Sequence, residues 1–219
     1  MIDLCPCTEP EEIEARSFAM IDAEIPEPRP FAGTVWNIAR RLIHTCGDVD
    51  ILPQLVLSAA AVEAGITALR NGAPVFTDTE MACCGIPKRR MGALGTTARP
   101  LLSLPGIHER ASREKCTRAR AALLEAAPLL PGAIVAIGNA PTALLTLLEM
   151  LAQGLAAPAL IIGMPVGFVN AAASKELLCR SPYPHLCLRG RKGGSPLAAA
   201  SVNALAELAF HPPEPAIAP

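Results

Sequence analysis

The residue with the clearest capacity for acid–base chemistry is His44, one of only four histidines in the 219-residue chain. An unperturbed histidine exchanges a proton near neutral pH, which makes it a common general acid or base. If its segment is helical, Arg40 or Arg41 lies on the same helix face, three or four residues away. That arrangement suits an acid or base facing an anionic substrate. Spacing alone favours the plainer alternative, a histidine at the end of a helix with two solvated arginines beside it.

Loops that can bind an anion recur in the C-terminal half of the chain. They span residues 138–142, 164–170 and 190–195. Each follows a short apolar segment expected to be a strand (133–137, 159–163 and 185–189), and each opens a helix. Strands alternating with helices predict a parallel sheet with right-handed crossovers. The loops then share one sheet edge, where open α/β folds bind ligands and helix N-termini attract anions. Ordinary glycine-rich turns are the alternative.

The remaining elements must position these loops and His44. The hydrophobic pattern predicts helices over residues 9–24, 34–45, 52–71 and 117–127, and a strand over 73–77. Residues 85–118 are irregular and basic, and are expected to form loops, with an edge strand as a further option. The predicted fold is a single α/β domain over residues 1–219, with loose ends at 1–8 and 211–219. Its parallel-rich central sheet is flanked by helices and doubly wound, with Rossmann-like or flavodoxin-like layers.

Composition excludes several classes of protein. Hydrophobic residues make up 51% of the chain and charged residues 18%, against about 25% charged in typical domains. Aromatic residues are only 3%, so Ala, Leu, Val and Ile must build the core. The net charge of −1 argues against binding to nucleic acid or to an anionic membrane surface. Proline, glycine and asparagine interrupt the long uncharged stretches, so no membrane span is expected.

The N-terminus and the cysteines indicate a cytoplasmic protein without a metal. Acidic residues stand where an export signal would be basic and then apolar. The eight cysteines are therefore expected to be free thiols. Cys5-x-Cys7 and the Cys83-Cys84 pair lack the C-x2-C spacing of zinc sites. The sequence also lacks G-x-G-x-x-G after a strand and a G-x-S-x-G elbow, and residues 190–195 hold phosphate-loop residues in the wrong order.

Several long stretches carry a family resemblance. They are IEARSFAMID (13–22), RRLIHTCGD (40–48), GAPVFTD with the following Met81, CTRARAAL (116–123), VAIGNAPTALLTLLEM (135–150), LIIGMPVGFVNAAASKE (160–176) and GRKGGS (190–195). Through them the chain resembles the precorrin-8X methylmutase family of cobalamin (vitamin B12) biosynthesis, from about residue 11 to residue 210. Residues 88–115 depart from the family pattern, which leaves that part of the pocket open.

The resemblance implies an isomerase without a cofactor. A methyl group would move from C-11 to C-12 of ring C of precorrin-8X, formally a [1,5]-sigmatropic shift, to give hydrogenobyrinic acid. His44 matches the family's catalytic histidine, which would protonate or hydrogen-bond a ring nitrogen. Three alternatives remain open: a cobalt-precorrin-8 methylmutase giving cobyrinic acid, a non-catalytic tetrapyrrole-binding protein, and a phosphate or nucleotide binder using residues 190–195.

The implied substrate is a flat, apolar tetrapyrrole rimmed by carboxylates, so its pocket needs apolar walls and donors around them. Ser17 and Arg118 match family positions near the reacting ring. The other expected substrate-binding residues are Arg41, Thr77, Asn139, Thr142, Pro165, Val166, Phe168, Arg191, Lys192, Gly193 and Gly194. The family also implies a homodimer. All of this requires that His44 lies at the same sheet edge as the loops.

Overall fold

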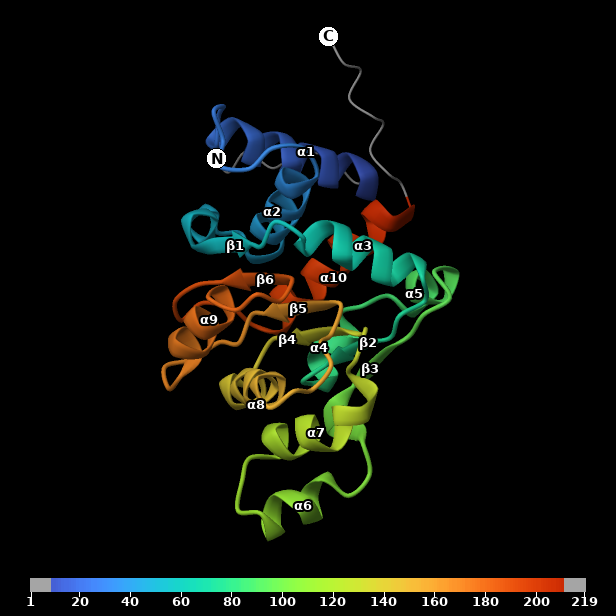
Figure 1. The fold of residues 1–219 in the computed structure, drawn as a ribbon. Coiled ribbons are helices and arrows are strands. Elements are labelled where there is room, and N and C mark those ends of the chain that lie inside the picture. Colours follow the sequence, from blue (N-terminus) through green and yellow to red (C-terminus); the bar gives the residue numbers. More distant parts are fainter. Residues whose placement is uncertain (1–8, 211–219) are drawn as a thin grey trace, which may run out of the picture.

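A six-stranded sheet forms the centre of the computed structural model, which describes residues 9–210 (Figure 1). The ends expected to be loose, 1–8 and 211–219, lie outside the described residues. The strand order is β1-β6-β5-β4-β2-β3, and every neighbouring pair is parallel except β1 with β6. The strands are β1 (Leu55–Leu57), β2 (Val75–Thr77), β3 (Ala98–Pro100), β4 (Ile134–Ile137), β5 (Leu160–Gly163) and β6 (His185–Leu188). The expected α/β fold with a parallel-rich sheet is confirmed.

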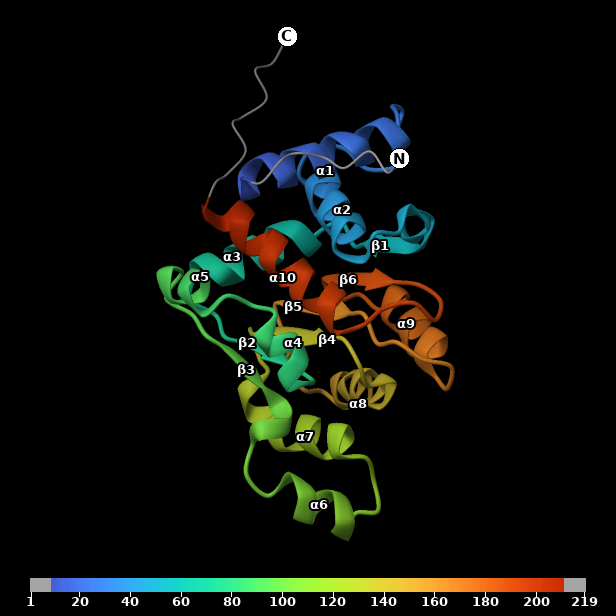
Figure 2. The same ribbon diagram turned by 180° about the vertical axis from the view of Figure 1, so that it is seen from behind.

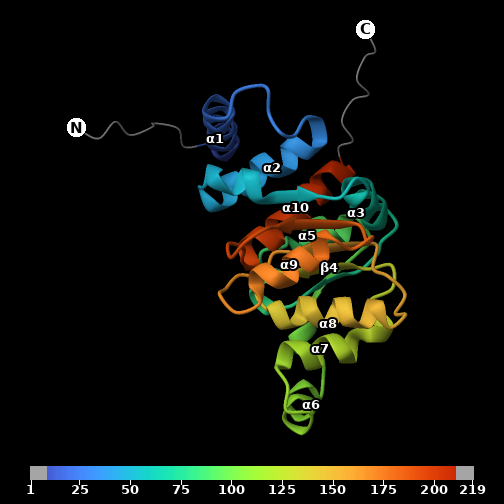
Figure 3. The same ribbon diagram turned by 60° about the vertical axis from the view of Figure 1, so that its left-hand side comes forward.

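Helices cover both faces of the sheet, as Figures 2 and 3 show from two further sides. One side carries α1 (Pro10–Glu24), α2 (Gly33–Cys46), α3 (Ala61–Arg70), α4 (Glu80–Cys84), α5 (Lys88–Ala93) and α10 (Ser195–Phe210). The other carries α6 (Ile107–Arg113), α7 (Arg118–Ala126), α8 (Pro141–Ala152) and α9 (Ala171–Cys179). Short 3-10 turns are η1 (Val49–Gln54), η2 (Leu101–Ser103) and η3 (Ala127–Leu129). Within residues 9–210, no helix combines the length and hydrophobicity needed to cross a membrane.

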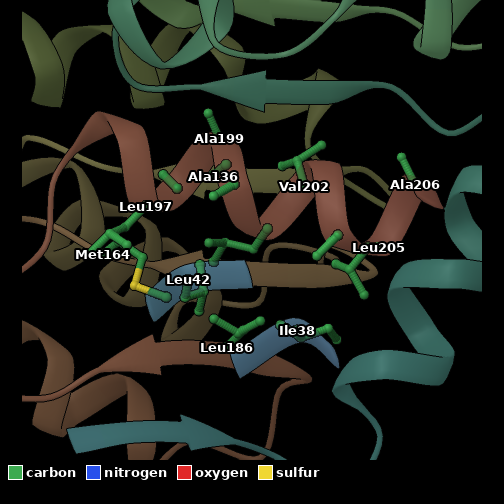
Figure 4. Close-up of a cluster of buried hydrophobic side chains, with 14 of the residues drawn as sticks. Ile38, Leu42, Ala136, Met164, Leu186, Leu197, Ala199, Val202, Leu205 and Ala206 are labelled. Atoms are coloured by element: carbon green, nitrogen blue, oxygen red, sulfur yellow. The ribbon is translucent and has the colours of Figure 1, made fainter. Parts of the chain in front are cut away.

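The core is built from small aliphatic side chains, as the low aromatic content requires. Successive strand residues point to opposite faces, so Ala136 belongs to the cluster under α10 and Val135 to the cluster under α8. Figure 4 shows α10 lying along the sheet with Leu42 of α2 beside it. A Cβ atom at Gly65 of α3 would lie 2.9 Å from the Leu205 side chain of α10, so these two helices pack closely.

The structure corrects the predicted helix over residues 52–71. The chain forms η1, then strand β1, and the helix α3 begins only at Ala61. Leu55 pairs with Leu188 of β6. The backbone of β1 is therefore hydrogen-bonded to β6, and it does not need the hydrogen bonds of a helix. A three-residue strand is too short for its alternation to be recognised within an Ala- and Leu-rich segment. Within residues 85–118, β3 is the edge strand that the sequence pattern offered as an option. The short helices α5 and α6 in this region were not predicted.

A buried carboxylate ties the end of β2 to the start of α8. Asp78 follows β2 and is 2% exposed, and it accepts the backbone N–H groups of Gly138, Asn139 and Ala140 at 2.9, 2.8 and 2.7 Å. Burial raises the pKa of the Asp78 carboxyl group, while the three N–H donors act in the opposite direction. These donors precede α8, whose N-terminus also favours a negative charge. Asp78 therefore fixes the loop before α8 to the end of β2, about sixty residues away in the chain.

We expect Asp78→Ala to lower the free energy of unfolding by about 2–4 kcal/mol, because it removes the carboxylate that accepts three backbone N–H groups. Asp78→Asn should lose about half as much, since one amide oxygen remains to accept. Urea unfolding checks both variants. The control is Asp50→Ala at an exposed position, which should stay within about 0.5 kcal/mol of the unmodified protein. Equal effects at positions 78 and 50 would contradict the role of Asp78 in fixing this loop.

Candidate functional site at the carboxyl edge of the sheet

The loops that follow β2, β4, β5 and β6 meet at one edge, called the carboxyl edge below. The Thr79 hydroxyl after β2 lies 3.0 Å from the Ser195 hydroxyl at the start of α10. The backbone N–H of Gly194 donates to the Met164 carbonyl after β5 at 2.8 Å. The N–H of Gly167 donates to the Arg191 carbonyl at 3.2 Å. The predicted convergence of the loops is therefore confirmed, and they support one another directly.

His44 lies at the same carboxyl edge because of the direction of β1. The chain leaves α2 at Gly47, a left-handed residue with φ 63°, and passes through η1 into β1. Since β1 is antiparallel to β6, it starts where β6 ends, and the Arg189 N–H donates to the Gln54 carbonyl at 2.8 Å. Asp48 then forms an ion pair with Lys192 in the loop after β6. In Figure 1 this turn and the loop after β6 lie on the same, left-hand side.

The His44 side chain is exposed and rests against α1. Its ring makes an edge contact with the Phe18 ring, with the centroids 5.4 Å apart and the planes at 70°. Ser17, the neighbour of Phe18, is half-buried on the same helix. An exposed imidazole at the end of a helix can give a proton to a ligand without the helix moving. The geometry thus suits a general acid.

Arg40 and Arg41 stack on Phe18 beside His44 but are engaged within the chain. Their guanidinium carbons lie 4.4 and 5.4 Å from the Phe18 ring centre. Arg40 pairs with Asp22 at 2.7 Å. Arg41 lies 3.0 Å from Glu14 and 2.8 Å from Glu207. The two arginines therefore hold α1 and α10 against α2, and the expectation that they face an anionic substrate is not supported.

The loop before α8 also differs from the expectation, because Asp78 already accepts the N–H groups of residues 138–140. Asn139 keeps an exposed side chain at this point, whereas the Thr142 hydroxyl accepts a hydrogen bond from the Thr117 hydroxyl at 3.0 Å. That bond places exposed Arg118, the first residue of α7, close to the start of α8. Asn139 and Arg118 are thus the groups available to a ligand here.

Several expected binding residues shape the loops instead of facing outward. Thr77 is fully buried, and its hydroxyl donates to the Thr79 carbonyl at 2.9 Å. Pro165 and Gly194 are also buried. A Cβ atom at Gly193 would lie 2.2 Å from the Met164 carbonyl oxygen, so only glycine fits between the loops after β5 and β6.

An exposed apolar surface accompanies these polar groups. Val166, Phe168 and Val169 after β5 are 43%, 84% and 79% exposed. The Arg191 guanidinium lies 5.1 Å from the Phe168 ring centre, a cation–π distance. Apolar side chains beside exposed Arg191 suit a ligand with a flat apolar body and anionic substituents.

Asp48, Asp78 and Lys175 help to shape this edge but were not recognised from the sequence. Asp48 pairs with Lys192, an expected binding residue, which lowers the pKa of the Asp48 carboxyl group and raises that of the Lys192 ammonium. Asp78 lies beside the predicted strand 73–77, and only its distant partners show its role. Lys175 falls within a predicted helix that gave no signal of burial. Within the described part of the chain, no three His, Cys, Asp or Glu residues cluster as a metal site would require.

Comparison with known proteins adds independent information. A family model described as precorrin-8X methylmutase matches residues 12–208. The chain is 44% identical to the precorrin-8X methylmutase of Sinorhizobium sp, over 89% of this chain and 92% of that protein. It is 40% identical to the cobalt-precorrin-8 methylmutase of Priestia megaterium, over 92% and 89%. The crystal structure of precorrin-8X methylmutase from Thermus thermophilus superposes with a TM-score of 0.83 at 41% identity, covering 90% of this chain and 97% of that one.

Replacing Gly193 tests the close contact between the two loops. We expect Gly193→Ala to lower the free energy of unfolding by about 1–3 kcal/mol, because its methyl group meets a backbone oxygen. Gly92→Ala in α5 is the matched control, since a Cβ atom there has open space. It should leave stability unchanged or raise it by up to about 1 kcal/mol. Thermal unfolding compares the two, and equal melting temperatures would contradict the close packing.

Proposed function

The chain belongs to the precorrin-8X methylmutase family, isomerases of cobalamin biosynthesis, and we propose that it moves a methyl group from C-11 to C-12 of ring C of precorrin-8X. The product is hydrogenobyrinic acid. One carbon–carbon bond breaks and one forms within the same molecule, so no atom enters or leaves. The reaction therefore needs neither an external methyl donor nor a redox partner. We assign it no cofactor and no metal ligand from the protein.

The position of His44 carries the proposal. Its exposed ring stands at the carboxyl edge, and the Asp48–Lys192 ion pair joins the turn after it to the loop after β6. A tetrapyrrole laid across the loops would bring a ring nitrogen toward this imidazole. By donating a proton or a hydrogen bond to that nitrogen, His44 makes the ring system more electron-poor and favours the shift. General acid assistance of this kind contributes about 10²–10⁴-fold.

The other groups at the edge suit the two parts of the substrate. Exposed Val166 and Phe168 provide an apolar surface for the macrocycle. Exposed Arg118 and Arg191 are cations available for the peripheral carboxylates, with Asn139 as a further donor. Lys192 contributes less, because its ammonium is shared with Asp48. Ser17 on α1 completes the proposed binding surface.

We also propose that the protein acts as a cytoplasmic homodimer. Ile13 and Met20 on α1 are 46% and 65% exposed, and apolar side chains of this size favour contact with a second subunit. Because α1 also carries Phe18 and Ser17, a dimer through α1 would form next to His44. The biosynthetic role of the family supports the cytoplasmic location.

The relatives carry two names, precorrin-8X and cobalt-precorrin-8 methylmutase, which distinguish a metal-free substrate from one that contains cobalt. We propose the metal-free substrate. Incubating the protein with each substrate and separating the products by mass tests this choice. Binding of both compounds without conversion of either would indicate a non-catalytic tetrapyrrole-binding protein instead.

Replacing His44 tests the proposed acid. We expect His44→Ala to lower kcat by about 10²–10⁴-fold, because the proton donor is lost. The dissociation constant for hydrogenobyrinic acid, followed by visible absorption, should change less than about tenfold, since the apolar surface and the cations remain. The control is Glu63→Ala on α3, an exposed position after the end of β1 at the opposite edge of the sheet, which should keep the unmodified rate. Wild-type turnover by His44→Ala would refute the assignment.

A further inference from the structure

Lys175 is an unusual residue within α9, because its side chain is fully buried although it carries an ammonium group. Its Nζ atom donates to the backbone carbonyl of Lys192 at 2.7 Å. Among residues 9–210 it forms no ion pair with a carboxylate. Burial of an unpaired cation is unfavourable, so such a group is retained only where its hydrogen bonds fix something in place.

The carbonyl that Lys175 holds belongs to the central residue of the loop after β6. On either side of Lys192, the carbonyl of Arg191 accepts the N–H of Gly167, and the N–H of Gly194 donates to Met164. The loop is thus fixed to its neighbour after β5 at both flanks and to Lys175 at its centre. The Lys192 side chain leaves this fixed point toward Asp48, in the turn that follows His44.

We propose that Lys175 is a positioning residue that acts through Lys192 and Asp48 to set the distance between the loop after β6 and His44. The inference rests on the proposed function, because this distance affects a rate only if the protein catalyses the methyl shift. Lys175 itself touches neither substrate nor imidazole. A displacement of about 1 Å between a reacting group and its partner can lower a rate by about 10²-fold, so a distant support can control kcat.

The ionisation of Lys175 gives a readout that does not depend on activity. Burial lowers the pKa of its ammonium to about 8, whereas the neighbouring Cys187 and Cys179 thiols act weakly in the opposite direction. On the packed elements, α8 carries only Glu149, which pairs with Arg120, and β6 carries His185 beside Cys179. On α9 itself, Glu176 pairs with Arg189. Between the folded pKa and the ordinary value of 10.5, the unfolded chain binds more protons than the folded one. Stability therefore gains a contribution as pH rises through this range.

The first experiment compares Lys175→Met with Lys88→Met, an exposed control. Urea unfolding from pH 7.5 to 10.5, roughly spanning the two pKa values, should show the same pH dependence of stability for the unmodified protein and for Lys88→Met. In Lys175→Met the stability should rise less, or fall more, over this range, because the Lys175 contribution is lost. Lys175→Gln replaces the methionine variant if that variant does not fold. An unchanged pH dependence in Lys175→Met would overturn the burial of a titrating cation. This measurement stands even if the protein has no methylmutase activity.

The second experiment measures kcat and product binding for the same variants. Lys175→Met should lower kcat by about 10–100-fold and change the dissociation constant for hydrogenobyrinic acid less than about threefold. Lys88→Met should match the unmodified protein. If the unmodified protein converts precorrin-8X and Lys175→Met does so equally fast, only the positioning role fails. If the unmodified protein does not convert it, the proposed function fails.

The route through Lys192 and Asp48 is tested by combining substitutions. Asp48→Asn should also lower kcat, and adding it to Lys175→Met should produce less than the product of the two single effects. Exchanging the pair, with Asp48→Lys and Lys192→Asp together, should restore at least part of the loss caused by Asp48→Asn. Multiplicative effects, or no restoration by the exchanged pair, would overturn the coupling.

Discussion

The antiparallel pairing of β1 with β6 is the constraint on which the site depends. All other strands of the sheet run in one direction, so a helix before a parallel strand would end at the opposite edge from the ligand-binding loops. Because β1 is reversed, α2 must end at the carboxyl edge for its chain to enter β1, and His44 is carried there. Three residues of edge strand and the Asp48–Lys192 ion pair thereby fix the position of the only histidine proposed to react.

Backbone N–H groups in the loops at the carboxyl edge are used for hydrogen bonds within the chain, which limits how the edge can bind an anion. Asp78 occupies the N–H groups before α8, and Met164 accepts the N–H of Gly194. Backbone donors that commonly hold an anion in open α/β folds are therefore used to hold the loops together. In the proposed function, recognition of carboxylates therefore falls to the exposed side chains of Arg118 and Arg191. The hydrogen bonds between the loops hold the edge together, which suits a reaction controlled by geometry.

The sequence was informative where local pattern determines structure. The observed strands β4, β5 and β6 are buried at every residue, and the apolar runs at 133–137, 159–163 and 185–189 with their glycine-rich loops identified them and the edge they share. Strand β1 was missed because its pairing with β6 lies more than a hundred residues away and its three residues show no periodicity. For the same reason Asp78 and Lys175 could not be recognised. A carboxylate after a strand and a lysine in a helix are ordinary until their distant partners are known.

A methyl shift requires few reacting groups from the protein, but those groups must be placed accurately. A general acid worth about 10²–10⁴-fold corresponds to roughly 3–5 kcal/mol of barrier, and His44 alone can supply it. Its value depends on holding the imidazole within hydrogen-bonding distance of one ring nitrogen while the macrocycle lies against Val166 and Phe168. In the proposed arrangement, Phe18, Lys192 and Lys175 each act on that distance without reacting. The rate should therefore be as sensitive to the supports behind the site as to the histidine itself, because losing the geometry removes the benefit of the acid.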